Sequence, residues 1–88
     1  MNYIMIRHRV TDLLRWKTAY EAHAPARSAA GLKEEQLLHN ADDANEVVLL
    51  FSASDLKKAR EFATSPDLRE AMQRAGVSGA PEVLFLTD

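Results

Sequence analysis

The sequence predicts an α+β fold in which two helical segments cover one face of a four-stranded antiparallel sheet. Runs rich in β-branched and aromatic residues stand at both ends and in the middle of the chain. Between them lie two stretches whose apolar residues recur at three- and four-residue steps. Polar turns or a glycine separate these segments. The resulting order is β-α-β-β-α-β, within a single domain that spans residues 1–88.

The first strand is expected at residues 2–10, NYIMIRHRV. Successive side chains of a strand point to opposite faces. One face would carry Ile4, Ile6, His8 and Val10, and the other Tyr3, Met5, Arg7 and Arg9. Because the first set is mostly apolar, we expect it to pack against the helices, with His8 half-buried among its neighbours.

A helix is expected from Asp12 to Ala30, with Thr11 or Asp12 as its N-cap. Pro25 has no backbone N–H to donate, so it should kink this helix or end its first part. Gly31 is a plausible stop signal.

The middle of the chain predicts two strands, at residues 34–40 and 46–53, joined by a polar turn at 41–45. The apolar run from Val47 to Phe51 does not alternate, so both faces of this strand need to be covered. Two helical segments cover only one face. We therefore expect a homodimer in which two open sheet faces pack together; the alternative is a monomer with a partly exposed apolar face.

The second helical segment is expected in two pieces. Ser54 would cap a helix at residues 55–64, and Ser65 a second helix that begins at Pro66 and ends at Gly76. After a VSGAP loop, residues 82–87 (EVLFLT) predict the last strand. This order is that of the ferredoxin-like fold.

Composition excludes several functions. The chain has no cysteine, so disulfides and thiolate metal sites are ruled out. Its net charge of −2 disfavours general nucleic-acid binding. No apolar run approaches the length of a membrane span, and the first residues do not resemble a signal peptide. We therefore expect a cytoplasmic protein.

The first helical segment carries the most informative pattern. Trp16, Tyr20, His23 and Arg27 follow one another at helical spacing and would form one stripe. In a pocket, Trp16 and Tyr20 would form an apolar wall, Arg27 would hold an anion and His23 would transfer a proton. In the alternative interpretation, the aromatic residues belong to the core and the stripe merely continues past it.

The first strand offers Arg7 and His8 as candidates for a second wall of the pocket. A salt bridge to an acidic residue is the alternative role for Arg7, and a hydrogen-bonded structural role is the alternative for His8. His8, His23 and His39 lie on different elements and could meet around a metal ion, but their spacing matches no metal motif. We therefore expect no metal and no cofactor.

As a whole, the pattern resembles the dimeric α/β-barrel superfamily, and in particular small members related to antibiotic biosynthesis monooxygenases. The likeness is carried by the strand YIMIRHRV, the helical stretch DLLRWKTAYEAHAPARSAAG, the hairpin LLHNADDANEVVLLF, the helical stretch SDLKKAREFATSPDLREAMQRAGV and the strand PEVLFL. The resemblance implies a homodimer with a cavity between helices and sheet in each subunit. The superfamily includes cofactor-free monooxygenases, haem-degrading enzymes, polyketide cyclases and lactone-type isomerases.

Two functions remain open at this point. In the first, the protein is a cofactor-independent monooxygenase, cyclase or isomerase, with His23 and Arg27 as catalytic residues and a small aromatic or enolisable anion as substrate. In the second, it is a non-catalytic protein of the same fold that binds a small molecule or a partner. Haem or metal binding is a third, less favoured class. An open cavity beside His23 and Arg27 favours the first function, and a filled one favours the second.

Overall fold

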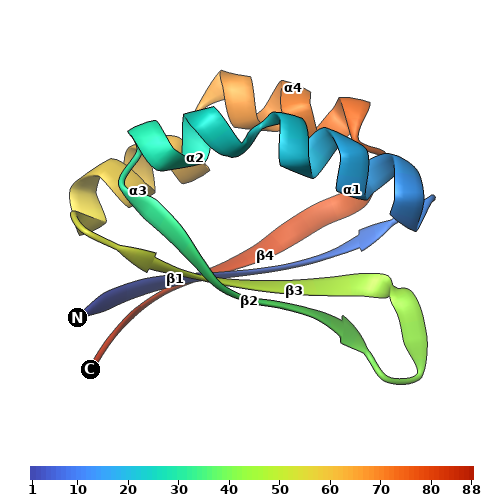
Figure 1. Cartoon of the computed structure of the whole chain (residues 1–88), viewed down its shortest axis with the longest axis horizontal. Coiled ribbons are helices and arrows are strands. Elements are labelled where there is room, and N and C mark those ends of the chain that lie inside the picture. The colour runs from blue at the N-terminus through green and yellow to red at the C-terminus, as the bar shows by residue number, and fades with distance from the viewer.

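Four strands and four helices follow one another in the computed structural model, which describes residues 1–88. The strands are β1 (Asn2–Val10), β2 (Leu32–Asn40), β3 (Asp43–Ala53) and β4 (Val77–Thr87). The helices are α1 (Leu13–Ala22), α2 (Ala24–Ala29), α3 (Leu56–Ala63) and α4 (Pro66–Arg74). The strands are antiparallel in the order β2-β3-β1-β4, and the helices cover one face of the sheet (Figure 1). The predicted ferredoxin-like fold is confirmed.

The first helical segment is split at His23, which ends α1 and precedes α2. Pro25 lies in the first turn of α2, where its missing N–H costs no hydrogen bond. Of the two expected effects of Pro25, a kink or an end to the first part of the helix, the structure shows the second, with α1 and α2 as separate helices. Gly31 follows them with a φ of 76°, a left-handed conformation that suits glycine.

The helix caps show which side chains start each helix. Asp12 caps α1 by accepting hydrogen bonds from the amides of Leu14 and Arg15, and Ser65 caps α4. The prediction of Ser54 as a cap was wrong. Asp55 caps α3 instead, because its carboxylate accepts the hydrogen bond from the backbone N–H of Lys57.

β1 has its predicted bounds, and the other three strands are longer than predicted because of how they pair. β2 begins at Leu32 and β3 at Asp43, so the predicted five-residue turn shrinks to residues 41–42. The predicted VSGAP loop lies within β4, because Val77 and Ser78 pair with β1, whereas residues 79–81 have no partner there. A register shift between Arg7 and Arg9 of β1 accommodates this extension.

The core lies between the sheet and the helices. Ile4 and Ile6 of β1 and Val47, Leu49 and Phe51 of β3 are all less than 4% exposed. They project from the helix-covered face, because alternate side chains of paired strands share a face. The predicted division of β1 into an apolar buried face and a mixed face is correct.

The opposite face, which we call the open face, carries a second set of apolar side chains. Leu38, Leu84 and Leu86 are 40–50% exposed on it, and Met5 and Leu50 are half-buried. No helix covers this face in the single chain (Figure 1). None of the four helices is long and apolar enough to cross a membrane.

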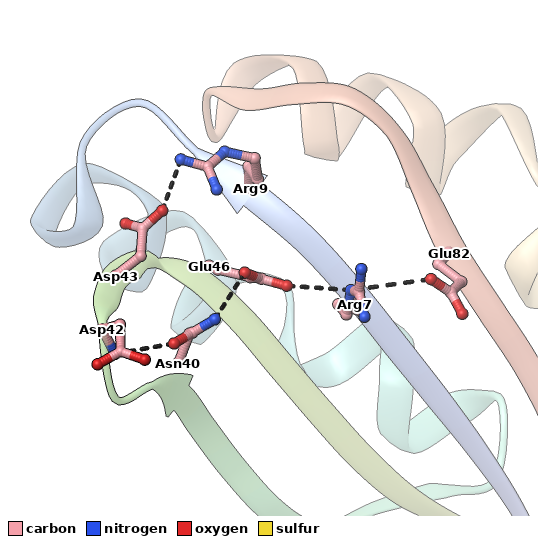
Figure 2. A network of polar contacts seen from close by, with 7 residues as sticks. All are labelled: Arg7, Arg9, Asn40, Asp42, Asp43, Glu46 and Glu82. Atoms are coloured by element: carbon pink, nitrogen blue, oxygen red, sulfur yellow. Dashed lines mark hydrogen bonds and ion pairs between the residues drawn. The ribbon is translucent and has the colours of Figure 1, made fainter.

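A network of charged side chains occupies one end of the open face (Figure 2). Arg7 Nε lies 3.0 Å from a carboxylate oxygen of Glu46 and 3.7 Å from one of Glu82. Asn40 donates to the second oxygen of Glu46, and Arg9 pairs with Asp43 at 2.6 Å. The open face is therefore apolar toward the chain termini and charged toward the β2–β3 turn, except that Leu38 lies on the edge strand level with Arg7.

Candidate functional site

A small cavity lies between the helices and the sheet. Its volume is about 50 Å³, and 14 residues of β1, β3 and all four helices or their connections line it. Most of these residues are apolar, and the only ones with side-chain nitrogens other than the indole are His8, His23 and Arg27. The cavity is thus an apolar space with a few basic groups in its wall.

His8 is the most unusual of these groups. Its side chain comes from the buried face of β1 and is 5% exposed, yet neither ring nitrogen has a hydrogen-bond partner. Burial lowers the pKa of His8 from 6.5 to about 4, so the ring is neutral at pH 7. A neutral imidazole has one donor and one acceptor nitrogen. In the single chain both nitrogens are therefore left without a hydrogen-bond partner, in a residue that lines the cavity.

His23 reaches the same cavity from the break between α1 and α2. Its Nε2 lies 3.1 Å from Oδ2 of Asp67, at the start of α4, and its ring packs against Phe62 of α3 with centroids 5.9 Å apart. A carboxylate on one ring nitrogen fixes the orientation of an imidazole. The helix break thus places an oriented histidine at the edge of an apolar cavity.

Tyr20 lies between two other members of the predicted stripe. Its ring stacks on Trp16 with centroids 4.9 Å apart and an interplanar angle of 18°. The guanidinium carbon of Arg27 lies 3.7 Å from the centroid of the Tyr20 ring. One ring face has no room for both groups, so the three side chains form a stack with Tyr20 at its centre.

Hydrogen bonds hold this stack in place. Nη1 of Arg27 donates to the carbonyl oxygen of Tyr20 at 2.7 Å, and the Tyr20 hydroxyl donates to Oε1 of Glu34 on β2 at 2.5 Å. Burial and the bond to Glu34 raise the pKa of Tyr20 above its usual range, and burial lowers the pKa of Arg27. Arg27 forms no ion pair within 4.0 Å.

The structure brings together five of the six residues predicted for the site. His8, Trp16, Tyr20, His23 and Arg27 all line the cavity. Arg7 does not, which corrects its placement in a second wall of the pocket. Its side chain leaves β1 on the opposite face of the sheet, where it pairs with Glu46 and Glu82. The alternative role, a salt bridge, describes Arg7 correctly.

The three histidines do not gather at one point. His8 and His23 line the cavity, whereas His39 lies in a separate groove between α1–α2 and β2. No group of three or more histidine or carboxylate side chains is arranged to hold a metal ion.

Two residues of the site escaped the sequence analysis. Asp67 lies 44 residues from its partner His23, and Glu34 lies 14 residues from its partner Tyr20. Both contacts join elements that meet only in the folded chain. Asp67 was visible only as an acidic residue at a helix start, and Glu34 only as a polar strand residue.

The sequence matches no protein-family model and no curated protein. Among solved structures, the chain is similar to a candidate antibiotic biosynthesis monooxygenase from Bordetella bronchiseptica, with a TM-score of 0.78, 13% identity, and coverage of 99% of this chain and 95% of that one. It is also similar to SnoaB, a cofactor-independent oxygenase from Streptomyces nogalater, with a TM-score of 0.75, 16% identity, and coverage of 99% and 91%. The chain shares their fold.

The same fold also occurs outside proteins named as oxygenases. An uncharacterised NIPSNAP domain protein from Burkholderia xenovorans matches with a TM-score of 0.66 and 16% identity, and the match covers 100% of this chain and 94% of that one. At such identities the likeness concerns the fold alone. Any activity of this chain has to be argued from its own cavity.

Proposed function

We propose that this protein is an enzyme that binds a small aromatic or enolisable anion in the cavity and transfers a proton on it without a cofactor. The buried, unpartnered imidazole of His8 is the observation that carries this proposal. A buried polar group without a hydrogen bond costs about 1–3 kcal/mol. A ligand oxygen bonded to His8 would offset that cost.

The residues of the cavity suggest separate roles in proton transfer. His23, oriented by Asp67, serves as the base, because a base held by a third group is the usual arrangement in acid–base catalysis. Neutral His8 donates a hydrogen bond to the substrate oxygen, and Arg27 compensates the negative charge. Trp16 and Tyr20 pack against the substrate ring. The product of this step is an enolate or phenolate, the electron-rich form that rearranges, closes a ring or reacts with dioxygen.

The test compares the wild-type chain with His8→Gln and His23→Gln variants. Exchange of the α-protons of 1-tetralone in D2O, followed by NMR, measures proton abstraction, and an oxygen electrode measures consumption of dioxygen with a panel of naphthols. We expect the wild-type protein to accelerate one of these reactions and each variant to lose about 10²-fold of the acceleration. Activity that survives the replacement of both His23 and Arg27 by alanine would refute these roles.

A non-catalytic ligand-binding protein is the second candidate. The volume of about 50 Å³ supports it, because the cavity as it stands is too small for an aromatic substrate and a protein without catalysis does not need to enclose one. Binding of a naphthol or 1-tetralone without exchange or oxidation would support this candidate over the enzyme.

We also propose that the protein is a homodimer in which two open faces pack together. The exposed Leu38, Leu84 and Leu86 support this proposal, because contiguous exposed apolar patches usually mark interaction surfaces. The charged network of Arg7, Glu46 and Glu82 would border the interface. Sedimentation equilibrium at micromolar concentration should give about twice the chain mass of 9.8 kDa.

A further inference from the structure

A second and much larger space lies outside the cavity. A groove of about 820 Å³ runs between α1–α2 and the edge strand β2. Trp16, Tyr20 and Arg27 line both the groove and the cavity. The stack formed by these side chains is therefore the partition between a space that is too small for a bicyclic ligand and one that is large enough for it.

Arg27 is a charged group of this partition that makes no direct ion pair, although the charge of the nearby Glu34 carboxylate favours its protonated form. It is half-buried, forms no ion pair within 4.0 Å, and uses one of its guanidinium N–H groups on the carbonyl of Tyr20. Burial disfavours its charged form, as the lowered pKa shows. An anion bound in the groove would compensate this charge and accept hydrogen bonds from the unused N–H groups of Arg27.

The other groove residues suit the ring of such a ligand. Leu13, Leu14 and Leu37 provide apolar surface, and Leu14 is 79% exposed. Lys17 adds a second cation, whereas Glu21 and Glu34 add two carboxylates that oppose an anion. The Tyr20 hydroxyl donates to Glu34, so one of the two carboxylates already has a hydrogen-bond donor.

We propose that this groove is an outer binding subsite for planar aromatic anions, in which Arg27 holds the negative oxygen and Tyr20 is a movable partition. Release of the Tyr20–Glu34 hydrogen bond would let the Tyr20 side chain swing and join the subsite to the cavity. The inference deepens the proposed function, because it states how an aromatic substrate reaches His8 and His23.

The first experiment tests the subsite with 1-naphthoate, titrated into ¹⁵N-labelled protein. We expect amide shift changes concentrated in α1, α2 and β2, and at least a tenfold loss of affinity in Arg27→Met, since a charge-assisted hydrogen bond contributes about 1.5–3 kcal/mol. Arg60→Met is the matched control. The guanidinium carbon of Arg60 lies 4.4 Å from the centroid of the Phe85 ring, and neither residue lines the groove. Its affinity should equal that of the wild type.

Arg27→Lys provides a second variant, which keeps a charge if the methionine variant unfolds. It should bind 1-naphthoate more weakly than the wild type and more tightly than Arg27→Met. Shift changes outside α1, α2 and β2, or wild-type affinity in both Arg27 variants, would overturn the subsite.

The second experiment tests the partition through Trp16, the single tryptophan of the chain, which is 3% exposed. Tyr20→Phe and Glu34→Gln remove or weaken the Tyr20–Glu34 hydrogen bond and keep the aromatic ring. We expect each to raise the acrylamide quenching constant of Trp16 about twofold or more, while Tyr3→Phe, whose hydroxyl lies on the open face, leaves it unchanged. Unchanged quenching in both Tyr20→Phe and Glu34→Gln would refute the movable partition.

These measurements do not depend on turnover. Groove binding that follows the predictions, without proton exchange or oxidation, would refute the proposed enzyme and leave the subsite standing. Proton exchange that depends on His8 and His23, without binding of 1-naphthoate in the groove, would refute the subsite alone.

Discussion

His8 and Trp16 meet edge to face, with ring centroids 5.6 Å apart and ring planes inclined by 66°. This contact joins the central strand β1 to helix α1 and closes one side of the cavity. The imidazole has no hydrogen-bond partner, so its burial beside the indole is what keeps His8 neutral by lowering its pKa. A change in the charge of His8 would therefore affect both the stability of the fold and the fluorescence of Trp16.

The buried His8 predicts a loss of stability at mildly acidic pH. Its pKa is about 4 in the folded chain and 6.5 when unperturbed, so the unfolded chain binds the proton first as the pH falls. The contribution of His8 is complete above pH 6.5 and declines between pH 6.5 and 4, by up to about 1.4 kcal/mol per pH unit. Urea denaturation at several pH values measures this slope.

His8→Leu is the control for this measurement, because it removes the titrating group and keeps an apolar side chain. Its free energy of unfolding should depend less on pH between 6.5 and 4. Asp43 and Asp88 do not account for the slope, since their lowered pKa values affect stability only at more acidic pH. The same slope in the variant would contradict the assignment to His8.

The pair of His23 and Asp67 predicts a separation between stability and activity. Asp67 is 69% exposed, so Asp67→Asn should change the free energy of unfolding by less than about 1 kcal/mol. If His23 acts on the substrate, loss of its orienting carboxylate should lower kcat while KM changes little. Thermal unfolding and the 1-tetralone exchange assay measure the two effects. Equal kcat in both proteins would show that Asp67 does not position the base.

Two glycines with similar backbone angles predict different costs of substitution. Gly31 has a φ of 76° and Gly79 a φ of 73°, so an alanine at either position pays about 1–2 kcal/mol of backbone strain. A Cβ at Gly31 would also overlap the hydroxyl of Ser54, whereas a Cβ at Gly79 meets nothing within 4 Å. Gly31→Ala should therefore lower the free energy of unfolding more than Gly79→Ala. Equal losses would mean that Ser54 turns away without cost.

Local signals explain what could be predicted from the sequence. Alternation in residues 2–10 identifies β1 and its buried face, and the pair Ser65–Pro66 identifies the start of α4, because each signal depends only on neighbouring residues. The extent of β4 depends on pairing with β1 instead. Gly79 and Pro81 suggest a loop, and residues 79–81 are indeed unpaired, but Val77 and Ser78 before them pair with β1 and extend the strand.

In the candidate site, too, local features could be predicted from the sequence and features that depend on tertiary contacts could not. Helical spacing places Trp16 and Tyr20 together, and their stacking agrees with it. His23 lies at a helix break that the spacing does not include, and Arg27 lies beyond it. Both still line the cavity, because α2 continues along the same face of the sheet. The isolation of His8 from polar partners could not be predicted, since it depends on every neighbour that the fold supplies.

The open face predicts a dimer that a single charge should disrupt. Leu84 pairs with Met5 across β4 and β1, and both side chains lie on that face. Leu84→Glu would place an unpaired carboxylate in the interface, at a cost of several kcal/mol. We expect sedimentation equilibrium to give the chain mass for this variant and twice that mass for the wild type. Leu14→Glu, on the exposed side of α1, should remain dimeric, and a monomeric wild-type protein would refute the dimer.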